Sequence, residues 1–430
     1  MDGSGVDFAF SFYERLRHRQ VGRRDRDVRR PDLWRIWAAS AGVMPSPSAT
    51  VLITGSKGKG STARLTAWGL TLHGAGPVGL LVSPEECSHL DRIRIDNQPI
   101  GEGEFDSIVE SIRSDLDALQ MAAPDNFYLP PTAVFLAVAL CWWRANGVRT
   151  CVVEGGRGAR WDEIGVIPAR LGVVTSILPE HLGKLGPTMT DVAADKLSLA
   201  ATVDQLLCPA ELQVWSEGIL APELQNRLRW LPVFRGAAGW YDTAHALASA
   251  ACGAILGRPV QLPAWAVPSF GQALVLCTPD GSACDCDVLF DGSVLPICLA
   301  PRLVGIGRRL PTAVVLGLDD DKDSLGLLAL THAVEASGPV YAVTLSSAIG
   351  HVGSTWIDDV QPAVVRLGTL DVVAGASPAL ASAISDLLRT HRSVVFVGVQ
   401  TFLRSMRNLL SLPIAGPTLA SNWNRLELSN

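Results

Sequence analysis

The sequence predicts an α/β protein with an N-terminal P-loop-type domain on a parallel-rich sheet and a smaller, Rossmann-like C-terminal domain. Short apolar runs alternate with helical segments from residue 50 onward, as in parallel sheets that are covered on both faces. A turn rich in Gly and Lys follows the first of these runs. The stretch "GRPVQLPAWAVPSFG" interrupts the alternation, which then resumes. We therefore expect two domains, at 1–262 and 263–430.

The elements of the first domain follow from their patterns. After a helical lead-in, "TVLIT" is expected to be a buried strand, and "STARLTAWGLTLHG" a helix that ends near Gly74. The segment "TAVFLAVALCWWRANG" predicts a helix that is apolar on nearly all sides. The other expected strands are "VGLLVS", "RTCVVEGG" and "LGVVTSI", and the other expected helices are "MTDVAADKLSLAATV" and "TAHALASAACGAIL".

In the second domain the same alternation predicts a second, smaller parallel sheet. Its expected helices are "PALASAISDLLRTH" and "TFLRSMRNLL", and its expected strands are "TAVVLGL", "PVYAVTL", "LDVVAG" and "SVVFVGV".

The composition excludes several classes of protein. With 48% hydrophobic and 18% charged residues, the chain suits a compact fold, and no apolar run is long enough for a membrane span. The first twenty residues do not read as a signal peptide. A net charge of -6 disfavours a general nucleic-acid binder, and the basic cluster "RLRHRQVGRRDRDVRR" is interpreted as a solvated helix face or loop. Most of the nine cysteines lie in apolar runs, which favours a reducing cytoplasm.

The glycine turn is the first candidate site. "TGSKGKGST" departs from G-x-x-x-x-G-K-[ST], because Ile53 replaces the first Gly and Gly60 follows the lysine. Gly55, Gly58 and Gly60 still allow positive φ and leave backbone N–H groups pointing inward. The next helix offers its N-terminus and Lys59 a positive charge, so phosphate binding is the better interpretation over an ordinary glycine-rich loop.

Three further residues gain interest from their position. Glu154 ends an apolar strand, where a nucleotide-bound Mg²⁺ needs an oxygen ligand. His181 follows the strand "LGVVTSI", so it would open at the same edge of the sheet. Taken alone, each could be structural, and Lys196 could be an ordinary solvated helix residue.

Four motifs in matching order and spacing carry a resemblance to a known family. Ser56 to Ser61 correspond to its T-N-G-K-G-S, and "SPEECSHLDRIRI" to its S-P-H-L…E-R-I-R-I. "EGGRGARWD" corresponds to E-V-G-x-G-G-R-x-D, and "TSILPEHLGKLGPTMTDVAADK" to T-S-I-x-x-D-H…L-G-x-T…I-A…K. The stretch from Thr50 to Leu199 thus resembles folylpolyglutamate synthase/dihydrofolate synthase, a branch of the Mur ligase superfamily. Farther on, "FDGSVLP" and "GLDDDKD" resemble D-G-A-H-N-P and G-x-x-x-D-K-D.

The resemblance implies an ATP-dependent ligase with Mg²⁺ that activates a carboxylate as an acyl phosphate and couples it to an amine. It implies that Lys59 and the loop amides hold the β- and γ-phosphates, and that Asp291 contacts the ribose. Ser83 and Glu154 would ligate one Mg²⁺ and His181 a second, which a carbamylated Lys196 would support. The implied catalytic residues are Lys59, His181 and Lys196, and the implied ATP-binding residues are Gly55, Ser56, Lys57, Gly58, Lys59, Gly60, Ser61, Thr62, His245 and Asp291.

The chain departs from the family pattern on the adenosine side and on the acid side. Replacing a hydrogen-bonding residue by an apolar one typically removes about 1–3 kcal/mol of recognition for each buried contact. The substituted positions are Lys57 for Asn, Glu85 and Glu86 for His and Leu, Leu129 for an acidic residue, His245 for Asn, Gln272 for Arg, and Val294 and Leu295 for His and Asn. Glu85, Glu86, Leu129, Arg160 and Asp162 are the candidate residues on the substrate side.

Three functional hypotheses remain open. The first is an ATP-dependent ligase that acts on a non-folate carboxylic acid and an amine or amino acid in a specialised biosynthetic pathway. The second is a folylpolyglutamate/dihydrofolate synthase that adds L-glutamate. The third is a catalytically silent nucleotide-binding scaffold. In each case we expect small-molecule ligands, no nucleic acid or membrane, a cytoplasmic location, and a monomer or small homo-oligomer.

Overall fold

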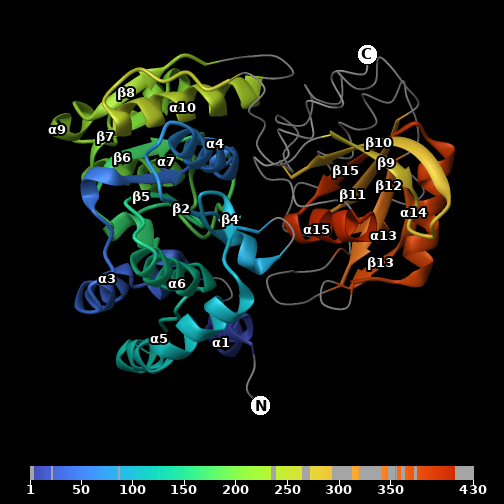
Figure 1. Ribbon diagram of the computed structural model, residues 1–430, viewed down its shortest axis with the longest axis horizontal. Helices are drawn as coiled ribbons and strands as arrows, with labels where there is room; N and C mark the ends of the chain where they lie inside the picture. Colours follow the sequence, from blue (N-terminus) through green and yellow to red (C-terminus); the bar gives the residue numbers. More distant parts are fainter. Residues whose placement is uncertain are drawn as a thin grey trace. The chain divides into compact units, whose positions relative to one another are not determined.

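The protein is described by a computed structural model that covers most of the chain (Figure 1). The described residues are 4–20, 23–85, 88–124, 126–233, 239–263, 272–292, 312–318, 340–346, 354, 356–359, 364–371 and 375–411. They fall into two compact units, one extending to Pro263 and the other from Gln272 to Ser411, with the first two residues of α10 grouped with the second unit. No helix in these ranges is long and apolar enough to cross a membrane.

The first unit contains an eight-stranded sheet with the order β4-β3-β2-β5-β1-β6-β7-β8. The six strands from β2 to β8 in this order pair in parallel, and β3 and β4 add an antiparallel edge. The strands are β1 (Thr50–Thr54), β2 (Val78–Leu81), β3 (Ile93–Ile95), β4 (Gln98–Pro99), β5 (Thr150–Glu154), β6 (Ala169–Val174), β7 (Val203–Pro209) and β8 (Leu228–Leu231). The parallel-rich sheet that the sequence predicts is confirmed.

Helices cover both faces of this sheet, as Figure 1 shows. One face packs against α4 (Lys59–Leu72) and α10 (Gly239–Leu256). The other face packs against a larger cluster of helices. Its members are α1 (Gly5–Gln20), α3 (Pro31–Ser40), α5 (Glu102–Ala122), α6 (Pro131–Ala145) and α7 (Met189–Leu197). Shorter helices are α2 (Asp25–Val28), α8 (Gln213–Ser216) and α9 (Pro222–Gln225), with 3₁₀ turns at Pro47–Ala49, His89–Arg92, Glu163–Val166, Ser198–Ala201 and Ala210–Leu212.

The nearly all-apolar pattern of α6 is explained by its position. Ten of its residues, from Ala133 to Trp143, are buried in the larger cluster. Gly79 of β2 lets this helix approach closely, since a Cβ at Gly79 would lie 2.6 Å from the Trp143 ring.

Helix α4 ends where the sequence predicts. Gly74 has φ +81° and directly follows the C-cap residue of this helix.

The second unit contains a seven-stranded sheet with the order β14-β13-β12-β11-β15-β10-β9. Its strands are β9 (Gln272–Cys277), β10 (Ala283–Asp291), β11 (Thr312–Gly317), β12 (Val340–Leu345), β13 (Val365–Asp371), β14 (Gly375–Ala376) and β15 (Ser393–Gly398). The amphipathic helices α14 (Pro378–Thr390) and α15 (Gln400–Leu409) pack on one face, and α13 (Trp356–Asp359) packs on the other.

The second sheet differs from the expected one in two respects. It is mixed, because β9 and β14 pair antiparallel with their neighbours, and the β9–β10 pair was not predicted. The strand expected over 370–375 begins earlier, since β13 occupies Val365–Asp371, and Gly375 belongs to the separate strand β14. The predicted α/β class with two sheets is confirmed.

Candidate functional site

The carboxyl ends of β2, β5, β1 and β6 meet at one edge of the first sheet, since these four strands are parallel neighbours. Each is followed by a segment with candidate residues. β1 leads into the glycine turn, β2 into Ser83, and β6 into the segment with His181, while β5 ends at Glu154. The first sheet therefore brings four of the sequence motifs to one place.

The glycine turn forms a strand–loop–helix connection as predicted. Gly58 has φ +85° and is the N-cap of α4, which begins without a side-chain cap. Gly55 has φ +145°, and a Cβ there would lie 2.0 Å from Thr175 Oγ1. Only glycine tolerates such a position, so the loop can close over β6 and leave the N-terminus of α4 to bind a negatively charged group.

The segment after β6 holds this loop in place. The Ser56 N–H group donates to the Ser176 carbonyl at 2.9 Å, and the Lys57 N–H group donates to Ser176 Oγ at 2.8 Å. Thr175 Oγ1 donates to the Lys57 carbonyl at 2.6 Å. Leu178 N–H donates to Ser56 Oγ at 3.0 Å. These bonds fix the backbone of the loop before any ligand arrives.

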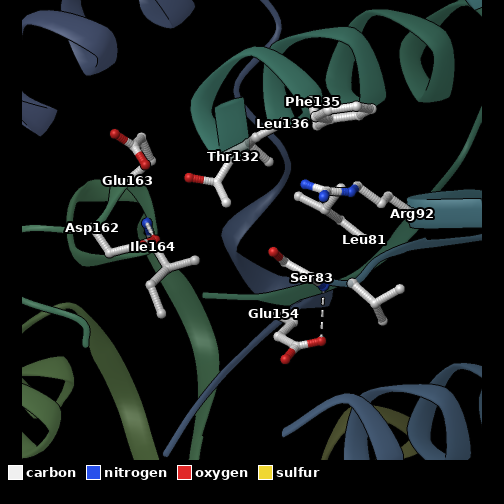
Figure 2. Close-up of a pocket in the computed structure, with 11 residues that line it drawn as sticks. Leu81, Ser83, Arg92, Thr132, Phe135, Leu136, Glu154, Asp162, Glu163 and Ile164 are labelled. Atoms are coloured by element: carbon white, nitrogen blue, oxygen red, sulfur yellow. Dashed lines mark hydrogen bonds between the residues drawn. The ribbon is translucent and has the colours of Figure 1, made fainter. Parts of the chain in front are cut away.

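Glu154 lies between the glycine turn and Ser83. Its Oε2 accepts a hydrogen bond from the Ser83 N–H group at 3.1 Å (Figure 2). A Cβ at Gly60 would lie 3.3 Å from the same oxygen, so the first turn of α4 passes close to the carboxylate. Burial raises the pKa of Glu154 to about 7, although the charge of Lys59 and the Ser83 N–H group lower it.

His181 and Glu180 follow β6 on the other side of the turn. Burial lowers the pKa of His181 to about 3, so its imidazole is neutral at pH 7 and keeps a lone pair for a metal ion. Burial raises the pKa of Glu180, but the attraction of Lys57, His181 and Lys59 outweighs it and lowers this pKa to about 2. Lys57 Nζ donates to Glu180 Oε1 at 2.7 Å.

Lys196 is the most unusual member of the group, because it is completely buried on α7. Within the described part of the chain, its Nζ has no hydrogen-bond partner, and the same holds for Asp195 Oδ2 and Glu180 Oε2. Burial lowers the pKa of Lys196 to about 7, and the charge of Lys59 acts in the same direction. The interpretation of Lys196 as an ordinary solvated helix residue is therefore excluded.

A pocket opens beside Glu154 at the ends of β2 and β5 (Figure 2). Arg92 enters it with its guanidinium 4.6 Å from the Phe135 ring centroid. Arg92 forms an ion pair with Glu85, in which Arg92 Nε donates to Glu85 Oε2 at 2.7 Å. The pocket is lined by Leu81, Val82, Ser83, Arg92, Thr132, Phe135, Leu136, Glu154, Asp162, Glu163 and Ile164.

The N-terminal segment supports the wall of this pocket. Arg29 is buried and contacts Asp162 and Glu163, with Nη1–Oδ2 and Nη2–Oε2 distances of 3.4 and 2.6 Å. Burial disfavours the charge of Arg29, but the two carboxylates outweigh it and raise its pKa. Next to it, the buried Asp25 accepts hydrogen bonds from Arg157. The interpretation of the basic cluster as solvated is thus wrong for Arg29.

The other predicted residues lie in several environments. Leu129 is buried in the larger core cluster, and Arg160 is exposed beside the Trp161 ring. His245 of α10 contacts the Pro263 carbonyl through Nε2 at 3.0 Å. Ser61 and Thr62 lie in the first turn of α4, with Thr62 fully buried. Asp291 ends β10 in the second unit, while the side chain of Asp291, together with Glu86, Val294 and Leu295, lies outside the described residues.

A divalent cation fits the edge next to the glycine turn. Glu154 is a buried carboxylate, a type of ligand that Mg²⁺ prefers, and the Ser83 N–H group donates to it. In the described ranges, no three His, Cys, Asp or Glu side chains are grouped so that they could hold a metal alone. Further oxygen ligands can come from water, from a bound phosphate or from a modified Lys196. The fold and this edge define an α/β protein with a candidate site for phosphate and a cation.

The known proteins that this chain resembles are named folylpolyglutamate synthase or dihydrofolate synthase. The chain matches no protein-family model. It is 34% identical over 163 residues to a probable bifunctional folylpolyglutamate synthase/dihydropteroate synthase of Halobacterium salinarum, which covers 37% of this chain and 19% of that relative. It is 32% identical over 147 residues to the folylpolyglutamate synthase of Lacticaseibacillus casei, which covers 34% of each protein.

The similarity of fold is far more extensive. A Mycobacterium tuberculosis folylpolyglutamate synthase complexed with ADP and AMPPCP has a TM-score of 0.69 at 18% identity, covering 94% of this chain and all of that one. Escherichia coli FolC in complex with DHPP and ADP has a TM-score of 0.67, covering 95% and 98%. The sequence matches span about a third or less of the curated relatives' length. The resemblance to folylpolyglutamate and dihydrofolate synthases is confirmed, in sequence over about a third of this chain and in fold over nearly all of it.

Proposed function

We propose that this protein is an ATP-dependent ligase that joins a carboxylic acid to an amine and uses Mg²⁺. The observation that carries the proposal is the convergence of Lys59, Ser83 and Glu154 at the ends of three adjacent parallel strands. The names of the relatives and the ADP and AMPPCP complexes of the structural neighbours support it.

Each residue has a defined task in this proposal. Lys59 and the N–H groups at the start of α4 hold the phosphates, and the fixed loop holds these donors in position before ATP binds. Bound Mg²⁺ supplies positive charge that offsets the charge of the transferred phosphoryl group. Ser83 and Glu154 would hold one ion, and the neutral His181 a second, supported by a carbamylated Lys196.

The chemistry requires no nucleophile from the protein. A carboxylate oxygen of the acid attacks the γ-phosphorus, and ADP leaves. The amine nitrogen then attacks the acyl carbon, inorganic phosphate leaves, and the amine loses a proton. The protein contributes position and charge, for which Lys59 and the helix N-terminus are placed at one edge of the sheet.

We infer that a folate-type acid with L-glutamate is at least as good a candidate as a non-folate acid. The relatives are named for folate chemistry. Two of the departures on the acid side do not reach the pocket as free groups, because Leu129 is in the core and Glu85 is paired with Arg92. The preference for a non-folate acid therefore gains no support.

The test is ADP release with dihydropteroate or tetrahydrofolate plus L-glutamate, and with a panel of other acids and amines. We expect release that needs both an acid and an amine, with a product whose mass equals acid plus amine minus water. Lys59→Ala should abolish it. No acid-dependent release from any pair would contradict the ligase proposal and favour a silent nucleotide-binding protein.

A further inference from the structure

We propose that Lys57 acts as a positioning residue through Glu180. Their ion pair then couples the glycine turn, which contains Lys57, to the segment that carries His181. This inference rests on the proposed function, because it concerns the binding of nucleotide and metal. It reassigns the Lys57 side chain, which the resemblance alone gave to the phosphates.

The ion pair joins two loops that are far apart in the sequence. Lys57 Nζ lies 2.7 Å from Glu180 Oε1, and 123 positions separate the two residues. The side chains are only 21% and 15% exposed, so water screens the pair weakly. The two charges therefore attract each other more strongly than the charges of a fully exposed pair.

The backbone of Lys57 is held by the same segment as its side chain. Its N–H group donates to Ser176 Oγ at 2.8 Å, and its carbonyl accepts from Thr175 Oγ1 and Ser176 Oγ at 2.6 and 3.0 Å. Lys57 is therefore fixed to the segment after β6 at three points of its own structure. A displacement of residues 175–180 must therefore also displace the glycine turn.

The far end of the pair lies next to the proposed metal ligand. His181 Nε2 is 3.9 Å from the Glu180 oxygen that accepts from Lys57. The other oxygen, Oε2, is buried and has no hydrogen-bond partner in the described part of the chain. Lys57 therefore fixes a carboxylate that directly adjoins His181, and both loops are held at the place where phosphate and metal would meet.

The two partners are both departures from the motifs that this chain otherwise matches. Lys57 stands where the T-N-G-K-G-S motif has Asn, and Glu180 stands where T-S-I-x-x-D-H has Asp. An Asn side chain has no charge for an ion pair. The added cation of Lys57 is in direct contact with Glu180, which keeps the carboxylate of the motif on a side chain one methylene longer.

The opposing view is that Lys57 binds phosphate directly and that Glu180 merely competes for it. The two views predict opposite signs for Glu180→Gln. If Glu180 positions Lys57, its loss weakens nucleotide binding. If Glu180 competes, its loss frees Lys57 and strengthens binding.

The experiment uses the full chain and the variants Lys57→Met, Glu180→Gln, their double variant and the exchange Lys57→Glu/Glu180→Lys. Glu110→Gln is the control, since it removes the acidic partner of the exposed Arg113–Glu110 pair on α5. Calorimetry measures ADP binding with Mn²⁺, and the Mn²⁺ electron paramagnetic resonance signal measures the metal. Hydrogen–deuterium exchange without nucleotide follows the segments 55–58 and 175–182.

We expect each single variant to weaken Mn²⁺-dependent ADP binding about tenfold, and the double variant about as much as either one. The exchanged pair should recover part of the affinity, and Glu110→Gln should not change it. Both segments should exchange faster in Lys57→Met and in Glu180→Gln. The inference is overturned if Glu180→Gln leaves binding unchanged or strengthens it, or if Lys57→Met leaves exchange of 175–182 unchanged.

Failure of the proposed function gives a different result. If the unaltered protein binds no ADP, the ligase proposal falls, while the exchange data still decide whether the two loops are coupled. Faster exchange of both segments in both single variants then supports the coupling, and unchanged exchange overturns it.

Discussion

Arg29 Nη2 donates a hydrogen bond to Glu163 Oε2 at 2.6 Å, although 134 positions separate these residues in the sequence. Glu163 lines the pocket beside Glu154, and Arg29 lies directly after α2 near the start of the chain. Both side chains are almost completely buried. The N-terminal segment therefore supports the pocket wall and is part of the site's framework.

Arg29→Met should destabilise the fold by about 3 kcal/mol, because it leaves two buried carboxylates without their cation. Urea unfolding measures the loss. The matched control is the neighbouring Arg30→Met, whose pair with Asp32 is exposed and whose loss should cost less than about 1 kcal/mol. Equal effects of the two variants would show that the buried pair has no special role.

Gly60→Ala should reduce binding of Mg²⁺ and nucleotide with little loss of stability. The added Cβ would lie 3.3 Å from Glu154 Oε2 and displace that carboxylate, while alanine favours the helix by about 1 kcal/mol. Gly103→Ala on α5 is the control, because no atom lies within 4 Å of its added Cβ. Calorimetric binding at full strength in Gly60→Ala would remove Glu154 from the proposed metal site.

Glu154 should make stability depend on pH in the absence of Mg²⁺. Burial raises its pKa to about 7, above its ordinary value of 4.5, so the folded state holds the proton more tightly than the unfolded state. Its contribution to stability is complete below pH 4.5 and is lost as the pH rises through about 7. Glu154→Gln should remove about 2–3 kcal/mol of this fall, measured by urea unfolding at pH 5 and pH 8. A pH profile that the substitution leaves unchanged would contradict the burial of this charge.

Lys196 should form a carbamate with CO₂. Burial lowers its pKa to about 7, so much of the amine is neutral at pH 8, and its Nζ has no hydrogen-bond partner among the described residues. Carbon-13 NMR with labelled bicarbonate should show a carbamate signal that Lys196→Met abolishes. Lys184→Met, which removes another lysine of the first unit, should keep the signal, and a signal that survives in Lys196→Met would refute the assignment.

The sequence predicted the four central strands of the first sheet, β2, β5, β1 and β6, and most of their edge, because these features are local. It did not predict β3, β4, β7 and β8, and it placed Val203, the first residue of β7, at the end of a helix. Apolar runs reveal the parallel strands, and position at a strand end is enough to bring Glu154 and the glycine turn together. The second sheet was predicted less well. Its antiparallel β9–β10 pair depends on contacts that a single apolar run does not indicate.

The support around the site was not predicted, because it consists of charge pairs between distant segments. Arg29 lies in a run of arginines in which nothing distinguishes a buried side chain from a solvated one. Arg92 could have been found, since it stands in the motif shared with the E-R-I-R-I pattern. Leu129 illustrates a residue that was given a role too readily. It was assigned to the substrate side because it replaces an acidic motif residue, but it packs in the core.

The central claim is that the glycine turn binds the phosphates of ATP together with Mg²⁺. The most direct measurement is a calorimetric titration with ATP, with and without Mg²⁺, on the unaltered protein and on Lys59→Ala. We expect micromolar binding that Mg²⁺ strengthens and that Lys59→Ala loses. Absence of binding, or equal binding in Lys59→Ala, would contradict the account.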